Sequence, residues 1–139
     1  MRERSSSSQS DSDLDNICTV QSLTTERAGV SVTLTDGSSF LVSSKDIDGL
    51  ALAEGAEVSV ADLSARSFRY ELSRARDKAL ELLARREHTG QEIARKLEQR
   101  GYRPAIISEC IAKLKDDKSI DEMRFAAYYV ESRLRKSPR

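Results

Sequence analysis

The sequence predicts a mainly α-helical protein with a small β segment near its N-terminal end. Residues 30–34 (VSVTL) alternate apolar and polar side chains, as a strand with one buried face does. From Phe68 onward, apolar residues instead recur every three or four positions, as on an amphipathic helix. Capping residues divide this helical part into separate helices. We therefore expect a β-hairpin or three-strand segment, then a three-helix repeat, then the first helix of a second repeat.

The 139 residues divide into an acidic and a basic half. Residues 1–63 hold 4 basic and 11 acidic side chains, a net charge of −7, and residues 64–139 hold 19 basic and 12 acidic ones, a net charge of +7. The basic half suggests contact with nucleic acid or an acidic protein surface. Helix faces that pair their charges in solvent would have the same composition, so this alternative stays open.

Four parts are expected along the chain. Residues 1–15 form a Ser/Asp-rich tail with too few apolar groups to fold, and 16–63 form the small acidic β segment. Residues 64–118 form the first three-helix repeat, and 119–139 form the first helix of a second, incomplete repeat.

The β segment contains three expected strands within 17–43, joined in part by a turn at Asp36-Gly37. A two-residue loop there would split the hydrophobic side chains between the two faces of the hairpin. A three-residue loop, 35–37, places Gly37 at a left-handed bulge position and pairs Val32 with Phe40. We therefore predict the three-residue loop.

Two short helical turns are expected after the hairpin. Ser44 would cap the first, and Gly49 would end it. Ser59 and Asp62 would form a weak capping box that begins a brief helix toward Arg66. A short extended piece at 57–59 lies between them.

The main helices are expected at about 69–86, 90–100 and 104–116. Thr89 and Glu92 have the spacing of a reciprocal capping box, which begins the second helix. Gly101 ends that helix, because glycine adopts the left-handed C′ conformation without a Cβ penalty. Pro104 suits the first position of the third helix, where its missing N–H costs nothing.

A fourth helix is expected from Glu122 to about Lys136, capped by Asp121. An offset of 47 residues aligns Ala79 with Ala126 and Leu83 with Val130, so this helix resembles the start of a second repeat. Its remaining helices are missing, so the chain looks shortened, and its apolar face would be covered by packing back or by self-association. The side expected to be buried contains Met123, Phe125, Ala126, Tyr129, Val130 and Leu134.

Several of these segments resemble the RecX family. Residues 79–89 (ALELLARREHT), with Glu92, Leu97 and the triplet at 100–102 (RGY), are similar to that family's first helical repeat. Residues 121–126 (DEMRFA) and 132–136 (SRLRK) are similar to its DDxRFA and SRxRK stretches. The resemblance is close over residues 69–139. Over residues 17–63 it extends only to the order of the expected elements.

The resemblance implies a regulatory protein with RecA recombinase and its DNA filament as partners. RecX-like proteins bind along the groove of the RecA–DNA filament and mostly inhibit its extension, ATPase activity and strand exchange. The implied setting is the cytoplasm, in DNA recombination, DNA repair and the SOS response. A nucleic-acid-binding helical module that acts without RecA, and an inactive fragment, are the alternatives.

The residues themselves predict neither an enzyme nor a cofactor or metal. His88 is the single histidine, and no glycine-rich phosphate loop or nucleophile with an adjacent base is present. The acidic residues at 116–117 and 121–122 flank helix ends, where they suit the helix dipole. Cys18 and Cys110 lie far apart and suggest reduced thiols of a cytosolic protein. No apolar run is long enough to span a membrane.

A sequence-reading helix-turn-helix is disfavoured, although the second and third helices have suitable lengths. The start of the third helix, 104–109 (PAIISE), lacks the donors that read base edges. Non-specific contact with phosphates requires only clustered Lys and Arg, and remains open.

Two basic clusters are therefore the candidate partner- or DNA-binding residues. The stem of Arg86 could instead pack over the apolar stripe, and Tyr128 and Tyr129 could stack on a partner or belong to the core. The first cluster is Arg85, Arg86, Arg95, Lys96, Arg100 and Arg103, and the second is Arg133, Arg135, Lys136 and Arg139.

Overall fold

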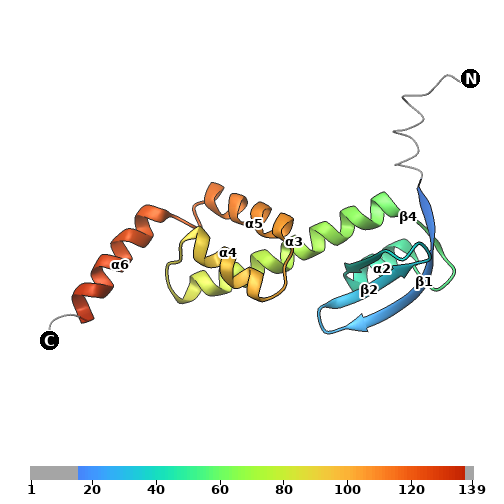
Figure 1. Cartoon of the computed structure of the whole chain (residues 1–139), viewed down its shortest axis with the longest axis horizontal. Coiled ribbons are helices and arrows are strands. Elements are labelled where there is room, and N and C mark those ends of the chain that lie inside the picture. Colours follow the sequence, from blue (N-terminus) through green and yellow to red (C-terminus); the bar gives the residue numbers. More distant parts are fainter. Residues whose placement is uncertain (1–15, 137–139) are drawn as a thin grey trace, which may run out of the picture. The chain divides into compact units, whose positions relative to one another are not determined.

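The computed structural model describes residues 16–136 and is mainly helical, with one small antiparallel sheet, as predicted (Figure 1). The expected tail at 1–15 lies outside the described residues. The elements are β1 (Ile17–Glu26), β2 (Gly29–Leu34), β3 (Ser39–Val42), α2 (Ser44–Leu50), β4 (Glu57–Ser59), α3 (Val60–Arg85), α4 (Gly90–Gln99), α5 (Pro104–Asp116) and α6 (Glu122–Lys136).

The chain divides into two compact units within α3, one ending at Glu71 and the other beginning at Leu72. The first unit contains the sheet, and the second contains the helices from the latter part of α3 onward. The four-part division expected from the sequence stays a prediction.

The first unit is built on a four-stranded sheet in the order β3-β2-β1-β4. Its β2–β3 hairpin pairs Val32 with Phe40 and Val30 with Val42, which confirms the three-residue loop. The Leu34 N–H donates to Ser38 O at 2.9 Å, and Gly37 has a φ of 93° at the predicted left-handed position. The loop therefore keeps the apolar side chains of both strands on one face.

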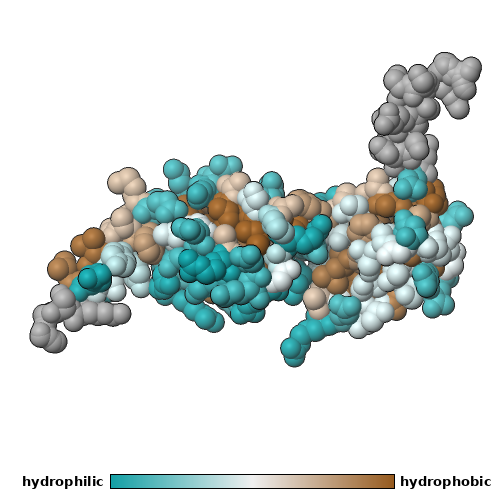
Figure 2. Space-filling model, viewed as in Figure 1, coloured by the Kyte–Doolittle hydropathy of each residue, from teal (hydrophilic) through white to brown (hydrophobic). Residues whose placement is uncertain are grey.

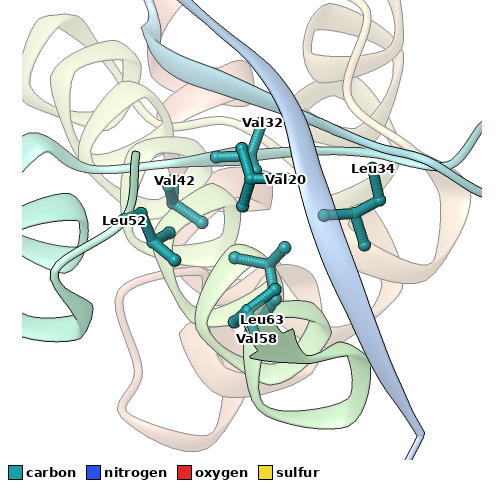
Figure 3. Close-up of a cluster of buried hydrophobic side chains, with 7 residues drawn as sticks. All are labelled: Val20, Val32, Leu34, Val42, Leu52, Val58 and Leu63. Atoms are coloured by element: carbon teal, nitrogen blue, oxygen red, sulfur yellow. The ribbon is translucent and has the colours of Figure 1, made fainter. Parts of the chain in front are cut away.

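Seven buried side chains form the core of this unit, and six of them come from the sheet and the loop after α2 (Figure 3). The seventh, Leu63, comes from the first turns of α3 and is fully buried. The N-terminal part of α3 thus closes the open face of the sheet. The seven are Val20, Val32, Leu34, Val42, Leu52, Val58 and Leu63.

The described residues form four strands, whereas three were predicted. Residues 57–59, expected only as an extended piece, form β4 and pair with β1 through Ile17–Ser59 and Thr19–Glu57. Three residues are too few to show a period in sequence, so only the pairing with β1 identifies this strand.

The expected ends of the short helix α2 were also wrong. Ser43, not Ser44, is the N-cap, and its side chain accepts from the Asp46 N–H at 3.2 Å. Ala51, not Gly49, takes the left-handed conformation at the C-terminal end, with a φ of 54°. Adjacent serines offer the same capping chemistry, so sequence alone could not choose between them.

The brief helix toward Arg66 and the helix expected at 69–86 are a single 26-residue helix, α3. Ser59 begins it as predicted, because its hydroxyl accepts from the Asp62 N–H at 3.2 Å. Residues 60–85 contain neither glycine nor proline, so nothing interrupts the backbone hydrogen bonds.

Within the second unit, α3, α4 and α5 bury a common apolar core. Its fully buried members include Ala79 from α3, Leu97 from α4 and Ile106 from α5. The predicted turn between α4 and α5 is confirmed: the Tyr102 N–H donates to Leu97 O at 3.2 Å and the Gly101 N–H to Glu98 O at 2.9 Å. This pair of bonds is the Schellman motif, with Gly101 at a φ of 92°.

The helix α6 begins as predicted, but its apolar side is not buried. The Arg124 N–H donates to the Asp121 carboxylate at 3.0 Å, which confirms the cap. Met123, Val130 and Leu134, expected in a core, are 82%, 56% and 67% exposed. Tyr129 and Ala126, expected on the same side, are exposed too, and Phe125 is half-buried. The apolar pattern was correctly identified, but burial also needs a second element against that face, and none of the described residues supplies one.

Candidate partner-binding site

The corner between α3 and α4 positions the first basic cluster. The Glu92 N–H donates to Thr89 Oγ1 at 3.0 Å, and the Thr89 N–H donates to Glu92 Oε1 at 3.1 Å, so the predicted capping box is confirmed. Partial burial acts to raise the pKa of Glu92, but the Thr89 N–H and the Arg86 guanidinium lower it below its usual value. The charged carboxylate therefore holds the corner together.

His88 is a structural part of this corner. It is 2% exposed, and its Nδ1 lies 2.9 Å from Arg86 O, so Nδ1 carries the proton and donates. Its Nε2 is buried without a hydrogen-bond partner among the described residues. Burial lowers the pKa of His88, and the charges of Arg86 and Lys96 add to this, so the neutral ring is favoured. The side chain thus packs the corner as a neutral group.

The beginning of α6 also contacts this corner. Arg124 Nε donates to Glu87 Oε2 at 2.7 Å, and the Gly90 N–H donates to Glu122 Oε2 at 3.2 Å. Glu122 thereby satisfies an N–H at the start of α4 that has no acceptor within that helix. Sequence reasoning missed both contacts, because the partners lie 37 and 32 residues apart and no local pattern links them.

Arg86 is turned into the corner rather than held out to a partner. Its Nη1 donates to Glu87 O at 2.7 Å and lies 3.5 Å from Glu92 Oε1. The side chain is half-buried, so Arg86 helps to hold the corner in place.

The other members of the first cluster lie at the surface. Arg85, Arg95, Arg100 and Arg103 are exposed, and Lys96 is half-buried beside the corner. The hydrogen bond from Lys78 lowers the pKa of Glu81 most, and the charges of Arg85 and Arg100 lower it further, so these two arginines lie near the same carboxylate. Figure 2 shows a hydrophilic surface over α4 and the end of α3.

The second cluster lies along the end of α6. Arg133 donates to the Tyr129 hydroxyl at 2.8 Å and stacks over its ring, 5.6 Å from the centroid. Arg135 lies 3.7 Å from Glu131 Oε2, one turn earlier. Lys136 is the last residue of the helix, and Arg139 lies outside the described residues. The structure therefore gives two arginines of this cluster partners within their own helix.

Asp117, which follows α5, has structural partners. Asp117 accepts from Arg76 at 2.7 Å and from the Ser119 N–H at 3.0 Å, and these bonds, those of Ser119 first, lower its pKa to about 2.

No group of three or more His, Cys, Asp or Glu residues in the described part of the chain could hold a metal ion. The helices between residues 16 and 136 include none that is long and apolar enough to cross a membrane.

Comparison with known proteins identifies the helical part. Residues 75–114 match the family model described as the first three-helix domain of RecX. A protein named regulatory protein RecX from Halorhodospira halophila is 48% identical over 59 residues, which are 42% of this chain and 37% of that protein. One with the same name from Chlorobium phaeobacteroides is 42% identical over 65 residues, 47% of this chain and 43% of that protein.

The fold agrees with a solved member of the family. A crystal structure of regulatory protein RecX matches 86% of this chain and 60% of its own, with a TM-score of 0.52 and 18% identity. That likeness concerns the fold alone, and the sequence matches span about two fifths of the length of the curated relatives. The capped α3–α4 corner, the Schellman turn and the matched segment lie together in residues 75–114, and this part of the chain is similar to the first three-helix domain of the RecX family.

Proposed function

We propose that this chain is a cytoplasmic regulatory protein that binds the RecA–DNA filament and inhibits RecA-driven ATP hydrolysis and strand exchange. The observation that carries the proposal is the match of residues 75–114 to the first three-helix domain of RecX. Relatives that share this domain are named regulatory protein RecX.

The charges of the domain support a contact with the filament. Arg85 and Arg100 lie near one carboxylate, and Arg95 and Arg103 are exposed on α4 and at the start of α5. Exposed guanidinium groups bind phosphates and carboxylates in a forked geometry, so this surface suits DNA phosphates and acidic protein side chains alike. Arg86 contributes by keeping the corner in shape.

The test is a titration of the purified chain into RecA filaments on single-stranded DNA at low salt. We expect ATP hydrolysis and strand exchange to fall as the chain is added. The variant Arg95→Glu/Arg100→Glu should require a higher concentration for the same inhibition, because its charges repel phosphates. If the unaltered chain in excess leaves both activities unchanged, the proposal is wrong.

A matched control separates the surface from the net charge. Arg27→Glu/Lys45→Glu makes the same change in charge at exposed positions of the sheet unit. It should inhibit as well as the unaltered chain. Equal loss in both double variants would indicate a general charge effect and would remove the role assigned to α4.

Binding to DNA without RecA is the second candidate, favoured by the exposed arginines on α4. Affinity for bare single-stranded DNA, measured against salt concentration, tests it, since each phosphate contact contributes a slope of about −0.7 for single strands. A steep slope with no gain in affinity when RecA is present would support this second candidate over the first.

A further inference from the structure

The helix α6 presents an apolar stripe to solvent. Met123, Ala127, Val130 and Leu134 follow one another at steps of four, three and four residues, so they share one face of the helix. All four are exposed. An aliphatic stripe of this kind marks a surface that binds another protein segment.

A groove of complementary character lies between α4 and α5. It is open, has a volume of 730 Å³ and is lined on its apolar part by Ala94, Ile107, Ile111 and Ala112. Figure 2 shows hydrophobic residues over α5 and again on α6. The groove lining includes none of the buried apolar side chains of the pair, which are Ile93, Leu97, Ile106, Cys110 and Leu114.

The stripe and the groove match in length. From Met123 to Leu134 the stripe spans about 16 Å at 1.5 Å per residue. The α5 side of the groove, from Pro104 to Lys115, spans the same distance, about 16 Å. A helix of the length of α6 is therefore long enough to lie along the whole groove.

The charges indicate in which direction a helix would lie in the groove. Lys115 lies at the Gly90 end of the groove, where its Cε is 3.0 Å from the position a Cβ on Gly90 would take. Glu98 lies at the other end, two turns further along α4. A helix that runs antiparallel to α5 brings the basic last turns of α6, with Arg133, to Glu98. The opposite direction would place Arg133 beside Lys115.

The α6 stripe does not fill the groove of its own molecule. The first turn of α6 is held at the α3–α4 corner by Glu122 and Arg124, and with these contacts made the stripe is exposed. We propose that the occupant is α6 of a second copy of this chain. Each copy offers one stripe and one groove, so a reciprocal exchange closes a dimer with twofold symmetry.

The experiment measures the mass of the purified chain by sedimentation over a dilution series, without RecA or DNA. We expect a reversible dimer. Val130→Glu damages only the stripe and Ala112→Arg blocks only the groove, and both positions are exposed, so folding should be kept. Each variant alone should be monomeric, and circular dichroism checks that its helices are intact.

The two variants should pair with each other. An equimolar mixture retains one intact stripe and one intact groove, so heterodimers should form at concentrations where neither variant pairs with itself. The matched controls, Glu131→Gln on α6 and Lys113→Gln on α5, change exposed residues outside the stripe and the groove lining and should dimerise normally.

The direction of the fit has its own test. Glu98→Arg should weaken the dimer, and adding Arg133→Glu to the same chain should restore it. A chain that stays monomeric at every soluble concentration, a dimer that survives Val130→Glu or Ala112→Arg, or a mixture that forms no heterodimer would each overturn the proposal. Because no RecA is present, these results are independent of the proposed regulatory function.

Discussion

At the scale of single residues, the corner between α3 and α4 concentrates the interactions that define the helical domain. Thr89 and Glu92 bond each other, Arg86 lies 3.5 Å from Glu92 Oε1, and His88 bonds the Arg86 carbonyl. The capping pair was predictable, because it depends on a spacing of three residues. The burial of His88 was not, because it depends on which side of the turn packs inward.

Removing the cap should destabilise the domain. Thr89→Ala leaves the Glu92 N–H without its acceptor, so the free energy of unfolding should fall by about 1 kcal/mol. Urea denaturation followed by circular dichroism measures this change. Thr89→Ser keeps the hydroxyl and serves as the control, and an equal loss in both variants would contradict the role of the cap.

The stability of the helical domain should depend on the protonation of His88. Its pKa is lowered in the folded state, so below an unfolded value of about 6.5 the unfolded chain binds a proton that the folded chain does not. Stability should therefore fall as the pH drops below that value, until the lowered folded-state pKa is reached.

Denaturation at a series of pH values measures this dependence, and His88→Gln should flatten it between neutral pH and the folded-state pKa. NMR titration of the His88 ring provides a direct check. A ring that titrates at or above the usual value would contradict the effect of burial.

At the scale of elements, the helix ends were more predictable than the helix lengths. The Schellman turn at Gly101 depends on one residue without a Cβ, and the structure places that residue at a φ of 92°. The length of α3 was underestimated. Caps and breakers mark the ends of a helix, but the only sign that a helix continues is the absence of breakers, as between Ser59 and Arg85.

Substitution of Gly101 should cost stability through its backbone conformation. A Cβ at Gly101 would meet no atom within 4 Å, so the strain of the left-handed conformation is the whole effect. Gly101→Ala should lower the free energy of unfolding by about 1 kcal/mol. Gly101→Asn should lose less, because asparagine tolerates this conformation, and thermal denaturation of both variants compares them. An alanine variant as stable as the parent would contradict this account.

At the scale of the whole molecule, α3 belongs to both compact units. Leu63 near its start is in the core of the sheet unit, whereas Ala79 near its end is in the core of the helical unit. No glycine or proline marks the boundary within α3, so the sequence could not indicate where one core ends and the next begins.

The two cores should respond separately to truncation. Leu63→Ala leaves a cavity and should cost about 2–5 kcal/mol. Hydrogen exchange should then increase in β1–β4, while the amides of α4 and α5 stay protected. Leu97→Ala should have the converse effect. Equal loss of protection in both units after either substitution would indicate a single cooperative core.

The sequence by itself determined the local features: the hairpin register, the capping box at Thr89, the Schellman turn and the Asp121 cap that begins α6. Each depends on residues a few positions apart, whose backbone geometry and side-chain chemistry are set locally. Only the tertiary structure decided which apolar faces are covered. It buried His88 and turned Arg86 inward, paired β4 with β1, and left the stripe of α6 exposed, because burial and long-range pairing depend on elements that are distant in sequence and meet only in the fold.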